Sequence, residues 1–151
     1  QRIWICGHSL GGAMATLCAS RLEELQPTLY TYGSPRVGGS EWRDGCDVEH
    51  YRFVNNNDIV TAVPLWLMGY RHHGIVRYIN YYGRIRRLSF WQKVKDSFRG
   101  RWKALTKFQM FDGIYDHDIA GGYADKLQAL WFESREKIRK RANVGHDREN
   151  V

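Results

Sequence analysis

Short apolar segments alternate with amphipathic ones along the first half of the chain. Residues 2–6, 29–32 and 49–54 are rich in β-branched, aromatic and other apolar residues, which predicts three strands, the first of them buried. Residues 13–25 predict a helix that ends before Pro27. Its apolar positions lie three or four residues apart, at Met14, Leu17, Cys18, Leu22 and Leu25. Strands that alternate with helices predict a mostly parallel sheet covered on both faces.

The pattern continues less regularly in the second half. Residues 41–45 predict a short helix, and residues 74–83, rich in Ile, Val and Tyr, predict a strand or hairpin near a sheet edge. Residues 91–107 and 120–140 predict two further helices. We therefore expect a domain over residues 1–140, with a basic amphipathic insertion at residues 84–111 and a charged tail at residues 141–151.

Composition is that of one globular domain. The 151 residues are 43% hydrophobic and 26% charged, and no apolar run approaches the length of a membrane span. The chain begins inside an apolar strand, with Gln1 rather than Met, so we interpret it as the carboxyl-terminal part of a longer domain and leave its localisation open. Cys6, Cys18 and Cys46 lack the spacing of a disulfide framework or a zinc site, and we expect them to be packing residues.

The strongest chemical motif is Gly7-His8-Ser9-Leu10-Gly11, which lies between the first strand and the first helix. The pattern Gly-x-Ser-x-Gly in this context is typical of the nucleophile turn of an α/β-hydrolase, where glycine is needed on both flanks. The serine then stands at a helix amino terminus, and the N–H of Leu10 becomes a natural oxyanion donor. The alternative is a glycine-rich turn whose serine only caps the helix.

A nucleophilic serine needs a base and an acid, and in this fold the chain order is Ser, then Asp or Glu, then His. Asp58 is the best candidate acid, because it follows the strand at residues 49–54 in a polar loop; the alternative is a turn residue. Asp44 and Asp47 precede that strand and therefore lie at the wrong end of the sheet.

His117 is the best candidate base, because it lies in a loop directly before the last long helix. The alternative for His117 is a residue at the helix entry, with Asp116 or Asp118 as the cap. His72 and His73 remain possible bases. Three other histidines are less suited: His8 points away from its neighbour Ser9, His50 begins a strand at the far end, and His146 lies in the charged tail.

Ordered segments along the chain resemble the class 3 lipases, the fungal-lipase-like group of triacylglycerol lipases. They cover residues 1–83 and 112–130 and include the elbow Gly7 to Ala13. The other stretches are Tyr30-Thr31-Tyr32-Gly33-Ser34-Pro35-Arg36-Val37-Gly38, Tyr51 to Val60 with Val63-Pro64, Tyr70 to Gly74, and Asp116-His117 through Tyr123 with Leu127.

The resemblance implies a partial α/β-hydrolase fold, the carboxyl-terminal half of a mostly parallel sheet with flanking helices. It implies Ser9 as nucleophile, Asp58 as acid, His117 as base and Leu10 as one oxyanion donor. Two departures stand out: the family's amino-terminal half, with its lid and other oxyanion donor, is missing, and residues 84–111 do not align.

Positive charge is concentrated in one segment. The net charge is +7, and residues 84–107 carry nine Lys or Arg against one acid, Asp96. Trp91, Val94, Phe98, Trp102 and Leu105 are spaced three or four residues apart within it. This pattern suits an anionic membrane or lipid interface, and the alternative is an ordinary amphipathic helix packed on the domain with a solvated basic face. Nucleic acid is a poorer partner, since the aromatic residues share the apolar face.

Together these features predict a serine carboxylester hydrolase, a lipase acting on acylglycerol-like lipid esters with no metal or organic cofactor. Two alternatives from other classes remain: a non-catalytic lipid-surface-binding module, and an inactive fragment of a lipase. A thioesterase or peptidase would share the same three residues.

Overall fold

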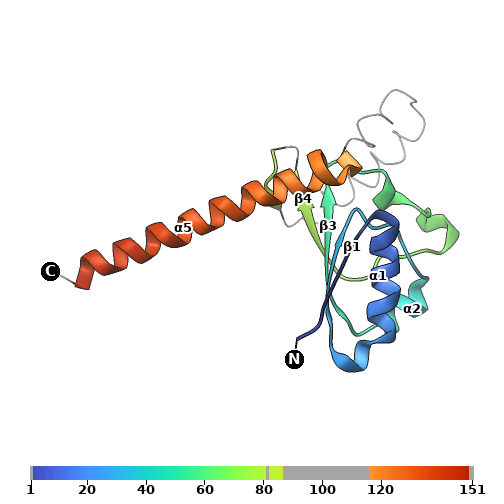
Figure 1. Ribbon diagram of the computed structural model, residues 1–151. Coiled ribbons are helices and arrows are strands. Elements are labelled where there is room, and N and C mark those ends of the chain that lie inside the picture. The colour runs from blue at the N-terminus through green and yellow to red at the C-terminus, as the bar shows by residue number, and fades with distance from the viewer. Residues whose placement is uncertain (1, 81, 87–115, 150–151) are drawn as a thin grey trace.

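The computed structural model describes residues 2–80, 82–86 and 116–149, with the backbone alone at residue 86 and at residues 140–149. A five-stranded sheet carries helix α1 on one face, and the long helix α5 begins above the ends of the strands and projects away from them (Figure 1).

The sheet has the order β1-β2-β3-β4-β5. Its strands are β1 (Trp4–His8), β2 (Thr28–Tyr32), β3 (Glu49–Asn55), β4 (Ile75–Ile79) and β5 (Ile85–Arg86). The first four are parallel, and β5 pairs antiparallel with β4 at the edge. The mostly parallel sheet and the strand expected near its edge within residues 74–83 are therefore confirmed, and the second strand of the edge hairpin, β5, lies just beyond that range.

The helices connect the strands in the expected order. They are α1 (Ser9–Arg21), η1 (Glu23–Leu25), α2 (Ser40–Gly45), η2 (Val60–Ala62), η3 (Trp66–Met68), the π-helix η5 (Ile119–Ala124) and α5 (Asp125–Glu149). Helix α1 starts at the serine itself, four residues before the predicted start. Helix α5 runs on to Glu149, well beyond the predicted end at residue 140.

Helix α1 packs on the sheet with its small side chains, not with its large ones. Gly12, Ala15, Thr16 and Ala19 are its buried residues. Ala15 and Ala19 join Leu29 and Val48 in the core, with Ile5 and Cys46 against them. The apolar positions that set the helical period are exposed instead. Only small residues allow the close approach of this helix to the sheet, since a Cβ at Gly12 would lie 2.8 Å from Cβ of Ser34.

Two predictions about burial are wrong. Strand β1 was expected to be buried, but it lies at an edge of the described sheet, and Trp4 is 73% exposed. The cysteines were expected to pack, but Cys6 and Cys18 are exposed and only Cys46 contacts the core. Among the described residues, no helix packs on the face of β1 that bears Trp4 and Cys6, which explains the exposure of these two residues. Cys18 is exposed for another reason, because it is not on the buried side of α1.

The expected helix at residues 91–107, and most of the insertion at residues 84–111, lie outside the described residues. The division of the chain into a domain, an insertion and a tail stays a prediction. None of the helices in the described ranges combines the length and the apolar character that crossing a bilayer requires.

Candidate active site

Ser9 lies on a sharp turn from β1 into α1. It follows His8, the last residue of β1, and is the first residue of α1. Its φ of +56° falls in the left-handed region, which a residue with a side chain rarely adopts. Backbone strain of this kind collects at functional sites, and this turn presents the Ser9 hydroxyl above the sheet at the start of a helix.

Glycine is needed on only one of the two expected flanks. A Cβ at Gly7 would lie 2.2 Å from the carbonyl oxygen of Gly11, so no side chain fits there. A Cβ at Gly11 would meet nothing within 4 Å, so the expectation is wrong at that position. The second crowded position is Gly12, one residue further on, where α1 passes against Ser34.

The structure brings Ser9, His117 and Asp58 together, although they come from three separate segments. The Ser9 hydroxyl lies 2.7 Å from Nε2 of His117, and Nδ1 of His117 lies 3.0 Å from both carboxylate oxygens of Asp58. A carboxylate only accepts, so Nδ1 carries the proton and Nε2 accepts from the serine. This tautomer is the one in which the imidazole can take the serine proton.

Asp58 is held by more than His117. Its side chain is fully buried, and Oδ1 accepts from the backbone N–H of Val60 at 2.9 Å. Oδ2 accepts from the hydroxyl of Tyr123 at 2.6 Å. With donors on both oxygens, the carboxylate has one orientation, and it is the orientation that faces the imidazole.

Tyr123 is the site residue that sequence reasoning missed. It is 1% exposed, and its hydroxyl donates to Asp58 while accepting from the backbone N–H of Asn55 at 2.9 Å. It lies in η5, a π-helix that begins after Asp118, whose carboxylate accepts from the N–H of Gly121. The sequence carries no usable signal for this role, because periodicity does not predict the π-helical turn that directs Tyr123 toward the acid.

His8 supports His117 from the other side. Its Nε2 donates to the backbone carbonyl of His117 at 2.8 Å, and the two rings stack with centroids 4.8 Å apart. These contacts give His8 a structural role beside His117. Gly33 lies against the Asp58–His117 pair, where no side chain fits. Its φ is +59°, and a Cβ there would lie 2.6 Å from Oδ2 of Asp58.

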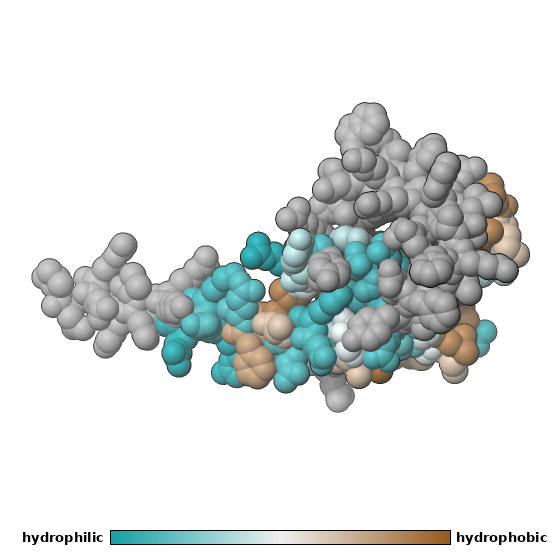
Figure 2. Space-filling view, turned by 90° about the horizontal axis from the view of Figure 1, so that it is seen from above, coloured by the Kyte–Doolittle hydropathy of each residue, from teal (hydrophilic) through white to brown (hydrophobic). Residues whose placement is uncertain are grey.

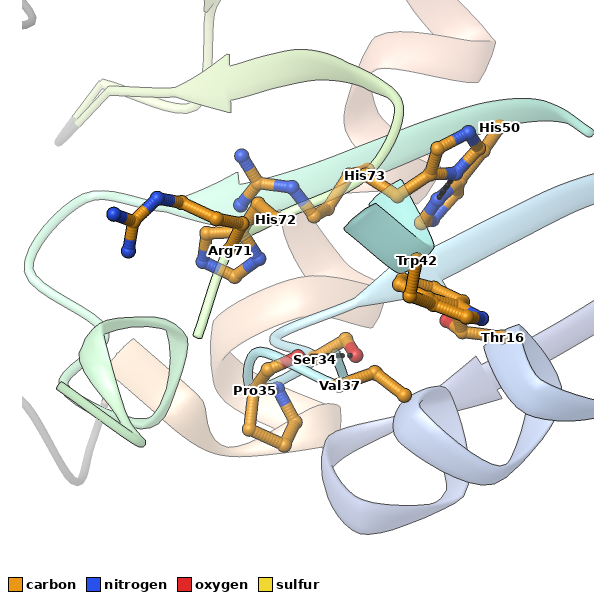
Figure 3. A pocket seen from close by; sticks show the side chains of 10 residues that line it. Thr16, Ser34, Pro35, Val37, Trp42, His50, Arg71, His72 and His73 are labelled. Carbon is orange, nitrogen blue, oxygen red and sulfur yellow. Dashed lines mark hydrogen bonds between the residues drawn. The ribbon is translucent and has the colours of Figure 1, made fainter. Parts of the chain in front are cut away.

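The alternative bases lie elsewhere. His72 and His73 line a small pocket on the α1 face of the sheet, together with His50, Arg52 and Trp42 (Figure 3). Nε2 of His72 donates to the carbonyl of Thr61 at 2.7 Å. The cavity in this pocket is about 10 Å³, which suffices for one water molecule and not for a substrate.

The histidines of this pocket form a chain with one consistent set of protons. Nε2 of His73 lies 3.1 Å from the carbonyl of Cys46 and must donate, so its Nδ1 accepts. That Nδ1 lies 3.3 Å from Nδ1 of His50, which therefore donates, and Nε2 of His50 accepts from the Thr31 hydroxyl at 2.8 Å. The chain works only while His50 and His73 are neutral, since a protonated His73 would turn its own N–H toward that of His50.

Burial keeps these imidazoles neutral. Burial, with His73 and Arg52 nearby, lowers the pKa of His50 to about 3. Burial and the charge of Arg52 lower the pKa of His72 to about 2, and burial also lowers the pKa of His73. Nε of Arg52 is itself buried without a hydrogen-bond partner among the described residues. The pocket is therefore a polar structural cluster rather than part of the serine site.

Leu10, the predicted oxyanion donor, is the second residue of α1. The N–H groups of the first helical turn have no acceptor within the helix, so the N–H of Leu10 is available above the serine. Leu10 as a residue is 69% exposed.

Apolar side chains are exposed around these residues. Leu10 and Ile119 are next to the serine and histidine segments, and the chain after Asp58 adds Ile59, Val63, Leu65, Trp66, Leu67 and Met68. We call these eight residues the apolar rim. Figure 2 shows apolar patches at the end of the molecule away from the projecting α5, on the side where Figure 1 places residues 60–69. Arg36 fixes this segment by donating to the carbonyls of Ala62 and Pro64.

Within the described ranges, no group of three or more His, Cys, Asp or Glu side chains is arranged to hold a metal ion.

Known proteins match the segment that carries the elbow and the acid. The family model described as lipase (class 3) matches residues 1–68. Toxin TseL of Vibrio cholerae is 41% identical over 73 residues, which cover 44% of this chain and 11% of the toxin. Secreted mono- and diacylglycerol lipase 1 of Fusarium solani is also 41% identical over 73 residues, covering 45% of this chain and 22% of that lipase.

The fold has a counterpart among solved structures. The triacylglyceride lipase of Rhizomucor miehei superimposes with a TM-score of 0.51 at 32% identity, covering 56% of this chain and 36% of the lipase. The chain thus spans well under half the length of the relatives it matches.

A parallel sheet with a strained serine between β1 and α1 is an α/β-hydrolase fold, present here in part. Residues 1–68 match the class 3 lipase family, and over this segment the chain is similar to members of that family.

Proposed function

We propose that this protein is a serine carboxylester hydrolase acting on acylglycerol-like lipids, with Ser9, His117 and Asp58 as its catalytic residues. The observation that carries the proposal is the hydrogen-bond chain from Ser9 through His117 to Asp58, with distances of 2.7 and 3.0 Å. The names of the relatives support the substrate class, since they include a mono- and diacylglycerol lipase and a triacylglyceride lipase.

Each residue has one role in the reaction. The Ser9 hydroxyl oxygen attacks the ester carbonyl carbon while its proton passes to Nε2 of His117. The carbonyl oxygen becomes an oxyanion that the N–H of Leu10 stabilises. The tetrahedral intermediate collapses, the alcohol leaves with the proton from His117, and water then attacks the acyl-serine with the same histidine as base. Asp58 holds the imidazole in the required tautomer and stabilises its charged form.

The apolar rim supports a lipid substrate. Eight large apolar side chains exposed beside the serine, acid and histidine segments would be costly in water and favourable against acyl chains. A soluble, polar ester would gain nothing from them.

The test is ester hydrolysis by three variants, Ser9→Ala, His117→Ala and Asp58→Asn. Each should lower kcat by orders of magnitude, and the double variants should be little worse than the single ones, because the residues act as a unit. Covalent labelling by a fluorophosphonate should be lost in Ser9→Ala. Absence of Ser9-dependent hydrolysis and labelling in the parent would favour a non-catalytic lipid-surface-binding module or an inactive fragment.

A further inference from the structure

Asn55, at the carboxyl end of β3, forms hydrogen bonds through both the nitrogen and the oxygen of its side-chain amide to the segment that carries His117. It is 0% exposed. Its amide nitrogen donates to the carbonyl of Asp116 at 2.8 Å and to that of Gly122 at 3.3 Å. Its amide oxygen accepts from Nζ of Lys126 at 2.8 Å. Only one orientation of the amide satisfies these partners, because the flipped amide would turn N–H groups toward an ammonium group and oxygen toward two carbonyls.

Asp116, the neighbour of His117, is fixed to the loop that ends in Asp58. Its Oδ2 accepts from the side-chain amide of Asn56 at 2.9 Å and from the backbone N–H of Asn57 at 3.1 Å. Its Oδ1 lies 3.7 Å from Nζ of Lys126. The residue before the base is thus joined to the residues before the acid.

Lys126 closes this network from the first turn of α5. Its ammonium group contacts both the Asn55 amide and the Asp116 carboxylate, and its side chain is only 21% exposed. Lys137, eleven residues further along the same helix, is different: it pairs with Glu133 at 2.6 Å, but the two side chains are 67% and 57% exposed. An exposed pair of that kind contributes little to stability. A mostly buried ammonium group with two polar partners instead holds those partners in one arrangement.

We propose that Lys126 and Asn55 are positioning residues for His117, which lock the segment at residues 116–126 onto the end of β3 and so set the imidazole between Ser9 and Asp58. This inference rests on the proposed function, in which His117 is the base. It differs from the role of Tyr123, which orients the acid, because the lock acts on the backbone on either side of the base.

The first experiment compares Lys126→Met with Lys137→Met, the same chemical change on the same helix. Lys126→Met should lower kcat about 10- to 100-fold with KM near its parent value, since a small displacement of a catalytic group has effects of this size. Lys137→Met should leave both constants unchanged, and Lys126→Arg should recover part of the loss. Equal kcat in the two Met variants would overturn the proposal.

A second measurement separates positioning from a general loss of structure. In a His117→Ala background, Lys126→Met should cost nothing further in the residual rate, because the lock acts only through His117. A purely structural residue would lower the residual rate in both backgrounds, and that result would overturn the proposal.

A readout independent of turnover keeps this inference distinct from the proposed function. The Nδ1 proton of His117, hydrogen-bonded to Asp58, should give a low-field proton NMR signal in the parent and in Lys137→Met, identified by its loss in His117→Ala. We expect Lys126→Met to lose it while remaining folded by circular dichroism. An unchanged signal in folded Lys126→Met would overturn the positioning role of Lys126, even if Ser9-dependent hydrolysis is demonstrated. Loss of the signal in this variant, with no hydrolysis by the parent, would support the positioning role and reject the proposed function.

Discussion

The hydroxyl of Tyr123 and Oδ2 of Asp58 are 2.6 Å apart, in a site where both side chains are almost fully buried. The hydroxyl donates to the carboxylate and accepts from the backbone of β3, so it fills the space between the acid and the sheet. Burial and the adjacent Asp58 carboxylate raise the pKa of Tyr123, which keeps its hydroxyl protonated and able to donate.

Tyr123→Phe should lower kcat about tenfold and the free energy of unfolding by about 1–3 kcal/mol, because it removes a donor to Asp58 and leaves the Asn55 N–H buried and unpaired. Kinetics with a short-chain ester and urea unfolding would measure the two effects. Tyr30→Phe is the control, since the Tyr30 hydroxyl makes no hydrogen bond to the described residues. Equal behaviour of the two variants would contradict the prediction.

Gly33→Ala should damage the site specifically. The new Cβ would lie 2.6 Å from Oδ2 of Asp58 and 3.0 Å from Nδ1 of His117, so the pair must move apart. We expect kcat to fall about a hundredfold. Gly69→Ala is the matched control, because Gly69 has φ of +88° with nothing within 4 Å of its Cβ position: it shares the backbone strain without the contact. If both variants lose the same activity, strain alone is responsible.

Stability should fall in mild acid because of the histidine pocket. The pKa of His50 is lowered from 6.5 to about 3 and that of His72 from 6.5 to about 2, so below pH 6.5 the unfolded chain binds protons that the folded chain excludes. The free energy of unfolding should then decrease as the pH falls from about 6.5 toward these values, by about 1.4 kcal/mol per pH unit for each histidine.

Urea unfolding at pH 7 and pH 5 would measure this loss. His72→Gln keeps an N–H donor for the Thr61 carbonyl but cannot be protonated, so it should reduce the difference between the two pH values by the share of one histidine. An unchanged difference in His72→Gln would show that His72 is not responsible.

Sequence patterns predicted the sheet, the serine turn and the order of the three site residues, because each depends on local features such as strand periodicity, glycine spacing and a polar loop after a strand. They did not predict which residues are buried, because burial depends on contacts between segments that are distant in the sequence. The face of α1 that is buried is the one with Ala15 and Ala19, since the sheet lies too close for Met14 or Leu17. Tyr123 and Lys126 could not be assigned either, because a π-helix shifts the angular position of every residue after it.

The apolar rim predicts a preference for aggregated substrate. Hydrolysis should rise when the ester is presented above its solubility limit, because acyl chains at an interface can cover Leu67 and Met68, which are 68% and 67% exposed. The double variant Leu67→Ser, Met68→Ser should lose this rise while keeping the rate on dissolved monomer. Equal rates on both forms of the ester in the parent would favour a soluble esterase.

The basic segment at residues 84–107 predicts binding to anionic lipid. Charge reversal at Arg99, Arg101 and Lys103 should weaken binding to vesicles that contain phosphatidylserine, because each cation near such a surface contributes about 1 kcal/mol. Hydrolysis of a small soluble ester should stay nearly unchanged, and added salt should weaken the parent's binding. Unchanged vesicle binding would assign the segment to a packed amphipathic helix.

The small residues on the buried side of α1 set the distance between this helix and the sheet, and so set the position of Ser9 at the start of the helix. Ser9 begins the same helix whose Gly12, Ala15 and Ala19 rest on the strands, whereas His117 arrives from a separate segment anchored on β3. Any larger side chain in that layer would raise Ser9 while leaving the imidazole where it is. Core substitutions intended to make the protein more stable should therefore avoid these three positions. A larger side chain there would lengthen the 2.7 Å contact between the Ser9 hydroxyl and Nε2 of His117, on which proton transfer depends.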